Sequence, residues 1–372
     1  MNFEPSEEQV MIADSVDQFG ARQYPPGERL HQLAAGPEAS AARWREMAEL
    51  GWLALGQAGG TAENDTFLMS LMQGFGRHLM LEPYVTRCIL VPALLESSSA
   101  PALAELRADI ATGRVQAALA LGEPAAGFDL SHVETVAVTQ TGGHCLTGVK
   151  SHVEDGADAE WFVVPARTQG SQDIALFLVP RDAAGLTIDR FRSIDGHRHA
   201  RLRLDDVAIS EHACIAPPGK GLSVLEAAVD RAIVAHLAEA LGSMDAASAA
   251  ALDYLKTRRQ FGVAIGSFQV LQHRMVDIDT RCEEARSMVY HATARLRAPA
   301  PVRRAAISAA KARVAQCGLF VTRQCVQLHG GVGVSAELIV SHHLKRQMML
   351  DLAYGNAAWH RTRFSEASDL AA

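Results

Sequence analysis

The run Arg258-Arg259-Gln260-Phe261-Gly262-Val263-Ala264-Ile265-Gly266-Ser267-Phe268-Gln269 is the most informative stretch of this 372-residue chain. It predicts a helix that ends with two arginines, a glycine that breaks the helix, and a second helix from about Phe268. An arginine guanidinium suits a diphosphate because it forms bidentate hydrogen bonds, and the Phe261 ring suits packing on another ring. The same residues also fit an ordinary helix end, where cations interact favourably with the helix dipole.

A second segment, Gln327-Leu328-His329-Gly330-Gly331-Val332-Gly333, ends another predicted helix. Its glycines let backbone N–H groups come close to a phosphate, although a helix cap followed by a loop explains them equally well. No Gly-Lys-Ser/Thr follows, so the segment is not a Walker loop. It is also not a GxGxxG run after a strand, which disfavours nicotinamide binding by a Rossmann unit.

Hydrophobic spacing divides the chain into three parts. Residues 1–115 have helix-spaced apolar positions, residues 116–215 alternate in short segments with glycine turns, and residues 216–372 are helical again. We therefore predict an α+β protein with an N-terminal helical domain, a middle antiparallel β domain and a C-terminal helical domain. The expected strands cover residues 133–139, 145–149, 161–165, 174–179 and 200–204, with a hairpin turn at Gly142-Gly143.

Composition excludes several classes of protein. Lys and Arg total 35 against 42 Asp and Glu, a formal net charge of −7, so nucleic acid is not an expected partner. No apolar run is long enough for a membrane span, and the polar stretch Met1–Gln9 does not resemble a signal peptide. The six cysteines form no CxxC pair. We expect a cytoplasmic protein with reduced thiols and no metal site.

Taken together, these features resemble the acyl-CoA dehydrogenase family over nearly the whole chain. The motifs that carry the resemblance follow the family's order and spacing: Phe3–Gln9, Gly122-Glu123-Pro124, Arg258–Gln269 and Gln327–Gly331. The resemblance implies a C-terminal four-helix bundle, with FAD in a cleft between the β domain and the bundle. It implies α,β-desaturation of an acyl-CoA thioester, with hydride transfer to flavin N5 and an electron-transfer flavoprotein as electron acceptor.

The resemblance also assigns binding roles to single residues. Contacts with the diphosphate or adenosine of FAD in one subunit are expected from Arg258, Phe261 and Gln269. Contacts with the FAD of a neighbouring subunit are expected from Gln327, Gly330 and Gly331. Asn356 stands where the family usually has a threonine that touches the flavin, and Arg231 is expected to meet the diphosphate of the acyl-CoA substrate.

The base of the family reaction is missing from its usual place. The family's glutamate corresponds to Tyr354, whose ordinary pKa near 10 suits proton abstraction poorly. Some relatives place the base on the first helix of the bundle, where this chain has Asp230. Burial on an apolar helix would raise the pKa of Asp230 and fit it for that role, although a structural or solvated role fits equally well. Glu239 is a weaker candidate, and His329, His342 and His343 are expected to pack or cap helices.

Two departures fall in the middle domain. The family's Gly-Ser-Asp loop reads Gly127-Phe128-Asp129, and its Trp-x-Thr reads His152-Val153-Glu154. The chain resembles the actinobacterial branch that forms α2β2 tetramers for steroid side chains and other bulky acyl groups, in which one subunit can lack a base. Three hypotheses stay open: an active dehydrogenase that forms a homodimer or homotetramer, with Asp230 as base; a non-catalytic or half-site subunit of a heterotetramer; and a flavin oxidase or monooxygenase.

Overall fold

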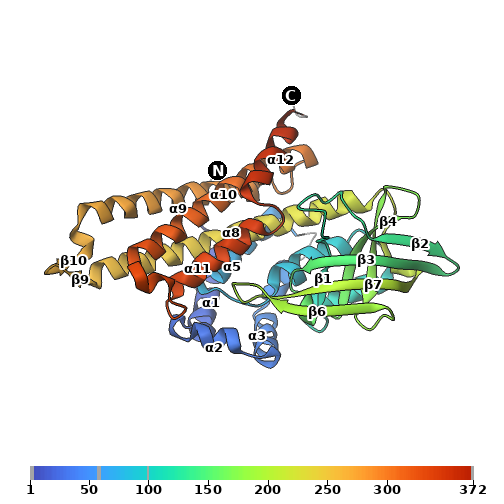
Figure 1. The fold of residues 1–372 in the computed structure, drawn as a ribbon, viewed down its shortest axis with the longest axis horizontal. Helices are drawn as coiled ribbons and strands as arrows, with labels where there is room; N and C mark the ends of the chain where they lie inside the picture. Colours follow the sequence, from blue (N-terminus) through green and yellow to red (C-terminus); the bar gives the residue numbers. More distant parts are fainter. Residues whose placement is uncertain (1–3, 57–59, 99, 370–372) are drawn as a thin grey trace. The chain divides into compact units, whose positions relative to one another are not determined.

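The structure is a computed structural model that describes residues 4–56, 60–98 and 100–369. The chain forms two compact units, which do not follow the order of the sequence (Figure 1). The helical unit comprises Met1–Arg43, Gly60–Leu81 and Ile233–Ala372, and the sheet unit comprises Trp44–Gly59 and Glu82–Ala232. The division into sequence domains at residues 115 and 215 stays a prediction.

The helical unit is built from helices of the N-terminal and the C-terminal parts of the chain. Its helices are α1 (Glu7–Gln23), η1 (Pro26–Glu28), α2 (Arg29–Ala34), α5 (Ala62–His78), η5 (Ile265–Ser267), α9 (Gln269–Arg295), α10 (Ala300–His329), η6 (Gly330–Val334), α11 (Ile339–Leu352) and α12 (Ala357–Asp369). Two helices continue from one unit into the other, α3 (Pro37–Glu49) and α8 (Gly221–Thr257). A short hairpin of β9 (Arg259–Gln260) and β10 (Val263–Ala264) joins α8 to α9.

Local signals in the sequence fix several helix ends. Ser6 is the N-cap of α1 and forms a capping box with Gln9: its hydroxyl accepts from the Gln9 N–H at 3.3 Å, and its own N–H donates to Gln9 Oε1 at 2.7 Å. Gly51 follows α3 with a φ of 76°, the left-handed conformation in which a glycine commonly ends a helix. Such caps satisfy backbone groups that the helix itself leaves without partners.

One turn of α8, residues 239–243, packs closely against α5. A Cβ atom at Gly76 would lie 1.8 Å from the carbonyl oxygen of Glu239, and one at Gly242 would lie 1.8 Å from that of Gln73. The two helices therefore touch backbone to backbone, which requires glycine at both positions.

The same turn of α8 is bonded to α11 by three side chains. Arg346 donates to both carboxylate oxygens of Glu239, from Nε at 2.6 Å and from Nη2 at 2.9 Å. Gln347 Nε2 donates to the carbonyl of Ala240 at 2.7 Å, and Ser243 Oγ lies 2.9 Å from His343 Nδ1. All of these side chains are buried. We call residues 239–243 with their partners on α5 and α11 the α8 clamp.

The sheet unit consists of one eight-stranded sheet and short helices. Its strands are β1 (Ala117–Leu119), β2 (Val136–Gln140), β3 (Gly143–Val153), β4 (Trp161–Thr168), β5 (Ile174–Pro180), β6 (Leu186–Arg192), β7 (Arg198–Ser210) and β8 (Cys214–Ala216). Its short helices are α4 (Trp52–Leu55), the π-helix η2 (Val85–Leu90), α6 (Val91–Leu95), α7 (Pro101–Ala111), η3 (Gly156–Asp158) and η4 (Glu211–Ala213).

The strands run in the order β6-β7-β3-β2-β4-β5-β8, and β1 pairs with β4. The expected strands and the hairpin turn between β2 and β3 are confirmed, while β1, β6 and β8 were not predicted. Most pairings are antiparallel as predicted, but β4 pairs in parallel with β1 and β2. The edge strand β6 escaped prediction because it is largely exposed and so lacks a clear apolar alternation.

Alanine, branched aliphatic side chains and two phenylalanines fill the core of the sheet unit. The core runs along β3, β4, β5 and β7, with Phe162, Phe177 and Leu202 among its fully buried members. No helix among residues 4–56, 60–98 and 100–369 is both long and apolar enough to cross a membrane.

The contact between α5 and α8 gives a stability prediction. Replacing Gly242 by alanine is expected to lower the free energy of unfolding by about 1–3 kcal/mol, because the new methyl group meets backbone atoms that cannot turn away. Urea denaturation at equilibrium measures the loss. The control is Gly36→Ala, which places a methyl group in open space and is expected to change the stability by less than about 0.5 kcal/mol. Equal losses in the two variants would contradict the contact.

Candidate functional site

The structure brings the Arg258 segment and the Gln327 segment to the same end of the helical unit. Tyr254, one turn before Arg258, stacks on His329, with ring centroids 4.5 Å apart and planes at 28°. His329 is buried and directly precedes Gly330. Figure 1 shows the β9–β10 hairpin at this end of the long helices. Sequence reasoning missed Tyr254, although its place one turn before Arg258 was a usable signal.

The β9–β10 hairpin leaves its polar and aromatic side chains exposed. Phe261 has a φ of 53° and is 91% exposed, and its ring meets the edge of Phe268 at 6.1 Å. Arg258 and Gln269, on either side of the hairpin, are also exposed. A bulky residue rarely adopts a left-handed backbone conformation, and a large aromatic ring is rarely so exposed. We therefore expect a ligand or a second chain to cover the Phe261 ring.

The end of α10 is open at its glycines. Gly330 has φ 66° and ψ −146°, a conformation that is essentially restricted to glycine. A Cβ atom at Gly330 or Gly331 would meet no other atom within 4 Å. Gln327, in the last turn of α10, is exposed. Backbone and amide groups at this helix end are therefore accessible to a ligand.

The loop that contains Tyr354 is fixed by a hydrogen bond and a ring contact with other residues of the helical unit. Tyr354 has a φ of 55°, and its carbonyl accepts a hydrogen bond from His360 Nε2 at 3.0 Å. The Tyr354 ring stacks on His236 of α8 at 5.8 Å and 18°. Gly355 is required next to it, since a Cβ atom there would lie 2.6 Å from the Trp359 ring. Asn356 caps α12 through its side-chain oxygen, which accepts from the Trp359 N–H at 2.9 Å.

The two carboxylates that are candidates for the catalytic base, Asp230 and Glu239, differ in their surroundings. Asp230 is 1% exposed within α8, and its neighbour Arg231 is half-buried. Glu239 is committed to a buried, bidentate ion pair with Arg346 in the α8 clamp. A carboxylate held in this way supports the packing of α8 on α11, and freeing it for proton transfer would leave Arg346 buried without its partner.

The three histidines singled out in the sequence serve helix packing. His329 Nδ1 lies 2.7 Å from the Cys325 carbonyl, His342 Nε2 lies 2.7 Å from the Ala336 carbonyl, and His343 is bonded to Ser243. Within the part of the chain that the structure describes, no group of three or more His, Cys, Asp or Glu side chains could hold a metal ion.

In the sheet unit, Glu123 of the Gly-Glu-Pro motif is buried in a hydrogen-bonded ion pair. Its Oε1 accepts from Lys150 Nζ and from Thr135 Oγ1, both at 2.6 Å, and Lys150 also donates to the Pro165 carbonyl. Burial favours the neutral acid, but Lys150 and the hydrogen bonds outweigh it and lower the pKa of Glu123. Burial in turn lowers the pKa of Lys150 to about 8. The Glu123 carboxylate is therefore occupied by contacts within the sheet unit.

The two segments of the middle domain that differ from the family's motifs also lie in the sheet unit. Asp129 closes a turn by accepting hydrogen bonds from the backbone and hydroxyl of Ser131, at 2.8 and 2.7 Å. His152 belongs to a cluster of aromatic rings with Phe191 and His199.

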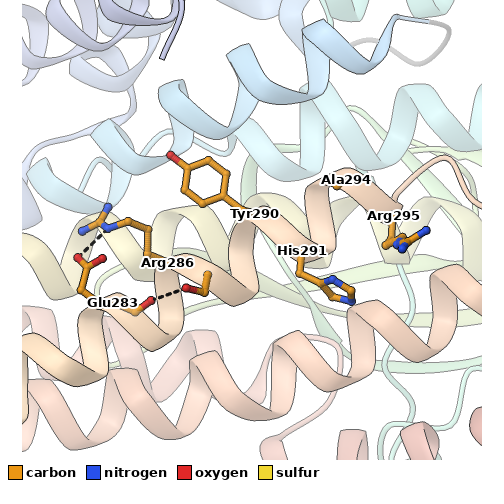
Figure 2. Close-up of a pocket in the computed structure, with 7 residues that line it drawn as sticks. Glu283, Arg286, Tyr290, His291, Ala294 and Arg295 are labelled. Atoms are coloured by element: carbon orange, nitrogen blue, oxygen red, sulfur yellow. Dashed lines mark hydrogen bonds and ion pairs between the residues drawn. The ribbon is translucent and has the colours of Figure 1, made fainter. Parts of the chain in front are cut away.

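Two cavities adjoin α9 in the helical unit, and none of the predicted site residues lines either. One has a volume of about 690 Å³ and follows α9 from Glu283 to Arg295 past Tyr290. Figure 2 shows Arg286 bonded to Glu283 at its edge. The other has about 590 Å³ and lies among α1, α5 and α9, with Met69 and Arg297 in its wall.

Comparisons with known proteins agree with this architecture. Residues 118–207 match the middle domain of acyl-CoA dehydrogenases and residues 219–368 match their C-terminal domain. The probable acyl-CoA dehydrogenase FadE25 of Mycobacterium tuberculosis is 30% identical over 66% of this chain, and the match spans 65% of that protein's length.

Two solved structures extend the similarity to nearly the whole chain. The steroid ACAD Tcur3481-Tcur3483 superposes with a TM-score of 0.85 and 26% identity over 98% of each chain. The ChsE4-ChsE5 complex of Mycobacterium tuberculosis gives a TM-score of 0.88 at 22% identity over 99% of each chain, which shows a common fold. The chain belongs to the acyl-CoA dehydrogenase family, whose members bind FAD.

The residues at the end of the helical unit fit FAD. They offer an exposed guanidinium and amide side chains for a diphosphate, open glycine backbone, and the exposed Phe261 ring for a flat partner. This donor set matches the chemistry of the ADP half of the cofactor.

The Tyr354 loop gives a pH-dependent prediction. Burial, with Lys311 and Arg363 nearby, lowers the pKa of His360 to about 3, against an ordinary value near 6.5. Below pH 6.5 the unfolded chain therefore binds a proton that the folded chain excludes, so His360 favours the unfolded state by up to about 1.4 kcal/mol per pH unit as the pH falls.

Replacing His360 by glutamine removes this titration. In thermal unfolding between pH 7 and pH 4.5, His360→Gln is expected to lose stability less steeply with falling pH than the unmodified chain does. His343, whose pKa burial also lowers to about 3, remains as a second titrating group in both proteins. Parallel pH profiles would contradict a neutral, buried His360.

Proposed function

We propose that this chain is a FAD-dependent acyl-CoA dehydrogenase that introduces an α,β double bond into an acyl-CoA thioester. One observation carries the proposal: the Arg258 and Gln327 segments, far apart in sequence, meet through Tyr254 and His329 at one end of the helical unit. Family membership supports it. The proposal extends to reoxidation by an electron-transfer flavoprotein and to a cytoplasmic oligomer, either a homodimer or homotetramer or a heterotetramer with a second subunit of the family.

The proposed cofactor contacts follow from the exposed groups. Arg258 neutralises the diphosphate of FAD, Phe261 packs on its adenosine, and Gln269 bonds to the same half of the molecule. The end of α10 receives the FAD of a neighbouring subunit. Its contacts are Gln327, Gly330 and Gly331. Bound FAD supplies the acceptor for the hydride that leaves the β-carbon.

Asp230 is the proposed base that takes the α-proton of the thioester. Its carboxylate is buried on α8, and a carboxylate within hydrogen-bond reach of the substrate's α-carbon can accept the proton. Arg231 is proposed to meet the phosphates of CoA, and Asn356 to flank the flavin. Glu239 is not proposed as base because Arg346 holds both of its oxygens.

A second candidate function is that of a half-site subunit in a heterotetramer. It is favoured by Tyr354, which stands at the family's glutamate position and stacks on His236. A tyrosine ring packed in this way offers no carboxylate for proton abstraction, so a partner subunit would supply the active base. A flavin oxidase is the remaining alternative, and oxygen consumption with substrate distinguishes it from a dehydrogenase.

The cofactor proposal predicts a yellow protein. The purified chain is expected to show flavin absorbance, and Arg258→Ala is expected to weaken FAD binding by about tenfold or more, since a charged hydrogen bond to the diphosphate is lost. The control is Arg361→Ala, an exposed arginine on α12 that is expected to leave FAD content unchanged. A colourless chain that does not take up added FAD would contradict the proposal.

The base proposal predicts a selective loss of activity. Asp230→Asn is expected to lower kcat for acyl-CoA oxidation with an artificial electron acceptor by about 10²–10⁴-fold, while FAD content stays unchanged. Asp253→Asn, an exposed aspartate on the same helix, is the matched control. Full activity of Asp230→Asn would exclude Asp230 as base. A chain that binds FAD but turns over only with a partner subunit would support the half-site function.

A further inference from the structure

The two cavities beside α9 adjoin each other along the second half of that helix. The first, of about 590 Å³, lies among α1, α5 and α9, and the second, of about 690 Å³, follows α9 from Glu283 to Arg295. Tyr290 and Ala294 line both cavities. Figure 2 shows these two residues on neighbouring turns of α9. Because Ala294 carries only a methyl group, one ligand can extend past it from the first cavity into the second.

The first cavity has an apolar strip in its wall. The strip consists of Val10 and Ala13 of α1, Met69 of α5 and Ala294 of α9. The hydroxyls in the same wall are already used, since Thr66, Ser70 and Thr293 donate to carbonyls of their own helices at 2.7, 3.3 and 2.9 Å. This wall therefore suits the apolar part of a ligand, and the thioether of Met69 adapts readily to its shape.

The arginines of the first cavity are also occupied. Arg77 is paired with Asp17, and Arg297 is paired with Asp65, with 2.6 Å between Arg297 Nε and Asp65 Oδ2. Each guanidinium is thus balanced by a carboxylate of the helical unit. A charged group of a ligand would have to displace one of these partners, so we do not expect it to lie here.

The second cavity differs because one of its cations is not balanced. Arg286 is bonded to Asp245 at 2.9 Å and to Glu283 at 3.0 Å. The side chains of His291 and Arg295 are exposed, and neither forms a hydrogen bond or an ion pair with any residue in the described part of the chain. His291 and Arg295 are four residues apart and so share one face of α9. Arg295 therefore gives this cavity an excess positive charge that favours an anion.

We propose that the two cavities together bind an amphipathic carboxylate, a molecule with an unbranched apolar chain and one carboxylate group. The apolar chain lies along the strip between α1, α5 and α9 and passes Ala294. The carboxylate lies against Arg295, whose guanidinium suits two carboxylate oxygens, and His291 lies beside it. Both cavity volumes fall within the range of small-molecule sites. The site does not rest on the proposed function, since no residue proposed for FAD, CoA or proton abstraction lines it.

Titration calorimetry of dodecanoate into the purified full chain tests the site. Saturable binding is expected, and Arg295→Ala is expected to weaken it by about tenfold or more, since one charged contact is lost. The matched control is Arg361→Ala, an exposed arginine of α12 outside both cavities, which is expected to leave the affinity unchanged. No saturable binding, or equal weakening by both variants, would overturn the proposal.

The passage at Ala294 and the length of the chain test the apolar part. Ala294→Trp is expected to abolish dodecanoate binding because the indole fills the passage, whereas Ala249→Trp, at an exposed alanine of α8, is expected to leave it unchanged. Decanoate is expected to bind the unmodified chain about tenfold more weakly than dodecanoate, since two buried methylene groups are lost. Unchanged binding by Ala294→Trp, or equal affinities for the two carboxylates, would contradict a chain buried along the strip.

Two further measurements separate this site from other occupants. Dodecanoate binding is expected to persist when octanoyl-CoA is present at saturation, and displacement would assign the carboxylate to the proposed acyl-CoA site and overturn the proposal. Native mass is recorded for each variant. An unchanged mass in Arg295→Ala is expected, whereas a change of oligomeric state would assign this face of α9 to a contact between subunits and overturn the proposal.

Discussion

The α8 clamp is the constraint on which the helical unit depends. At residues 239–243, α8 meets the backbone of α5 on one side, where glycine is required, and the side chains of Arg346, Gln347 and His343 on the other. The buried pair of Glu239 and Arg346 is stable only while both charges stay together. The clamp therefore fixes the rotation and height of α8 relative to α5 and α11, and with them the position of every residue toward the α8 C-terminus.

The end of the helical unit that is proposed to bind FAD depends on that alignment. Tyr254 lies three to four turns after the clamp on the same helix, and its stacking on His329 holds the end of α8 beside the end of α10. Exposed arginine, glutamine and phenylalanine side chains thus rest on a rigid base, as a binding site requires. The clamp also explains why Glu239, a carboxylate on the first bundle helix, is unsuited to proton transfer.

The order of helical, sheet and helical parts was predictable because periodicity changes sharply in the sequence. The two segments that are proposed to bind FAD could be singled out because arginine and glycine at helix ends are distinctive. The parallel pairings of β4 were not, since they join strands whose local patterns look the same in either direction. The roles of Glu239 and Glu123 also escaped prediction. Each depends on a partner far away in sequence, Arg346 in one case and, in the other, Lys150 across the sheet.

We propose that the Arg258 and Gln327 segments both bind FAD, the first that of one subunit and the second that of a neighbouring subunit, and hydrogen exchange measured by mass spectrometry tests this most directly. The full chain is compared with and without FAD, peptide by peptide. FAD is expected to slow exchange in peptides covering both 258–272 and 327–338, because the backbone amides of both segments become shielded. Bound FAD that leaves both segments unprotected, or protects only one of them, would contradict FAD binding by the two segments.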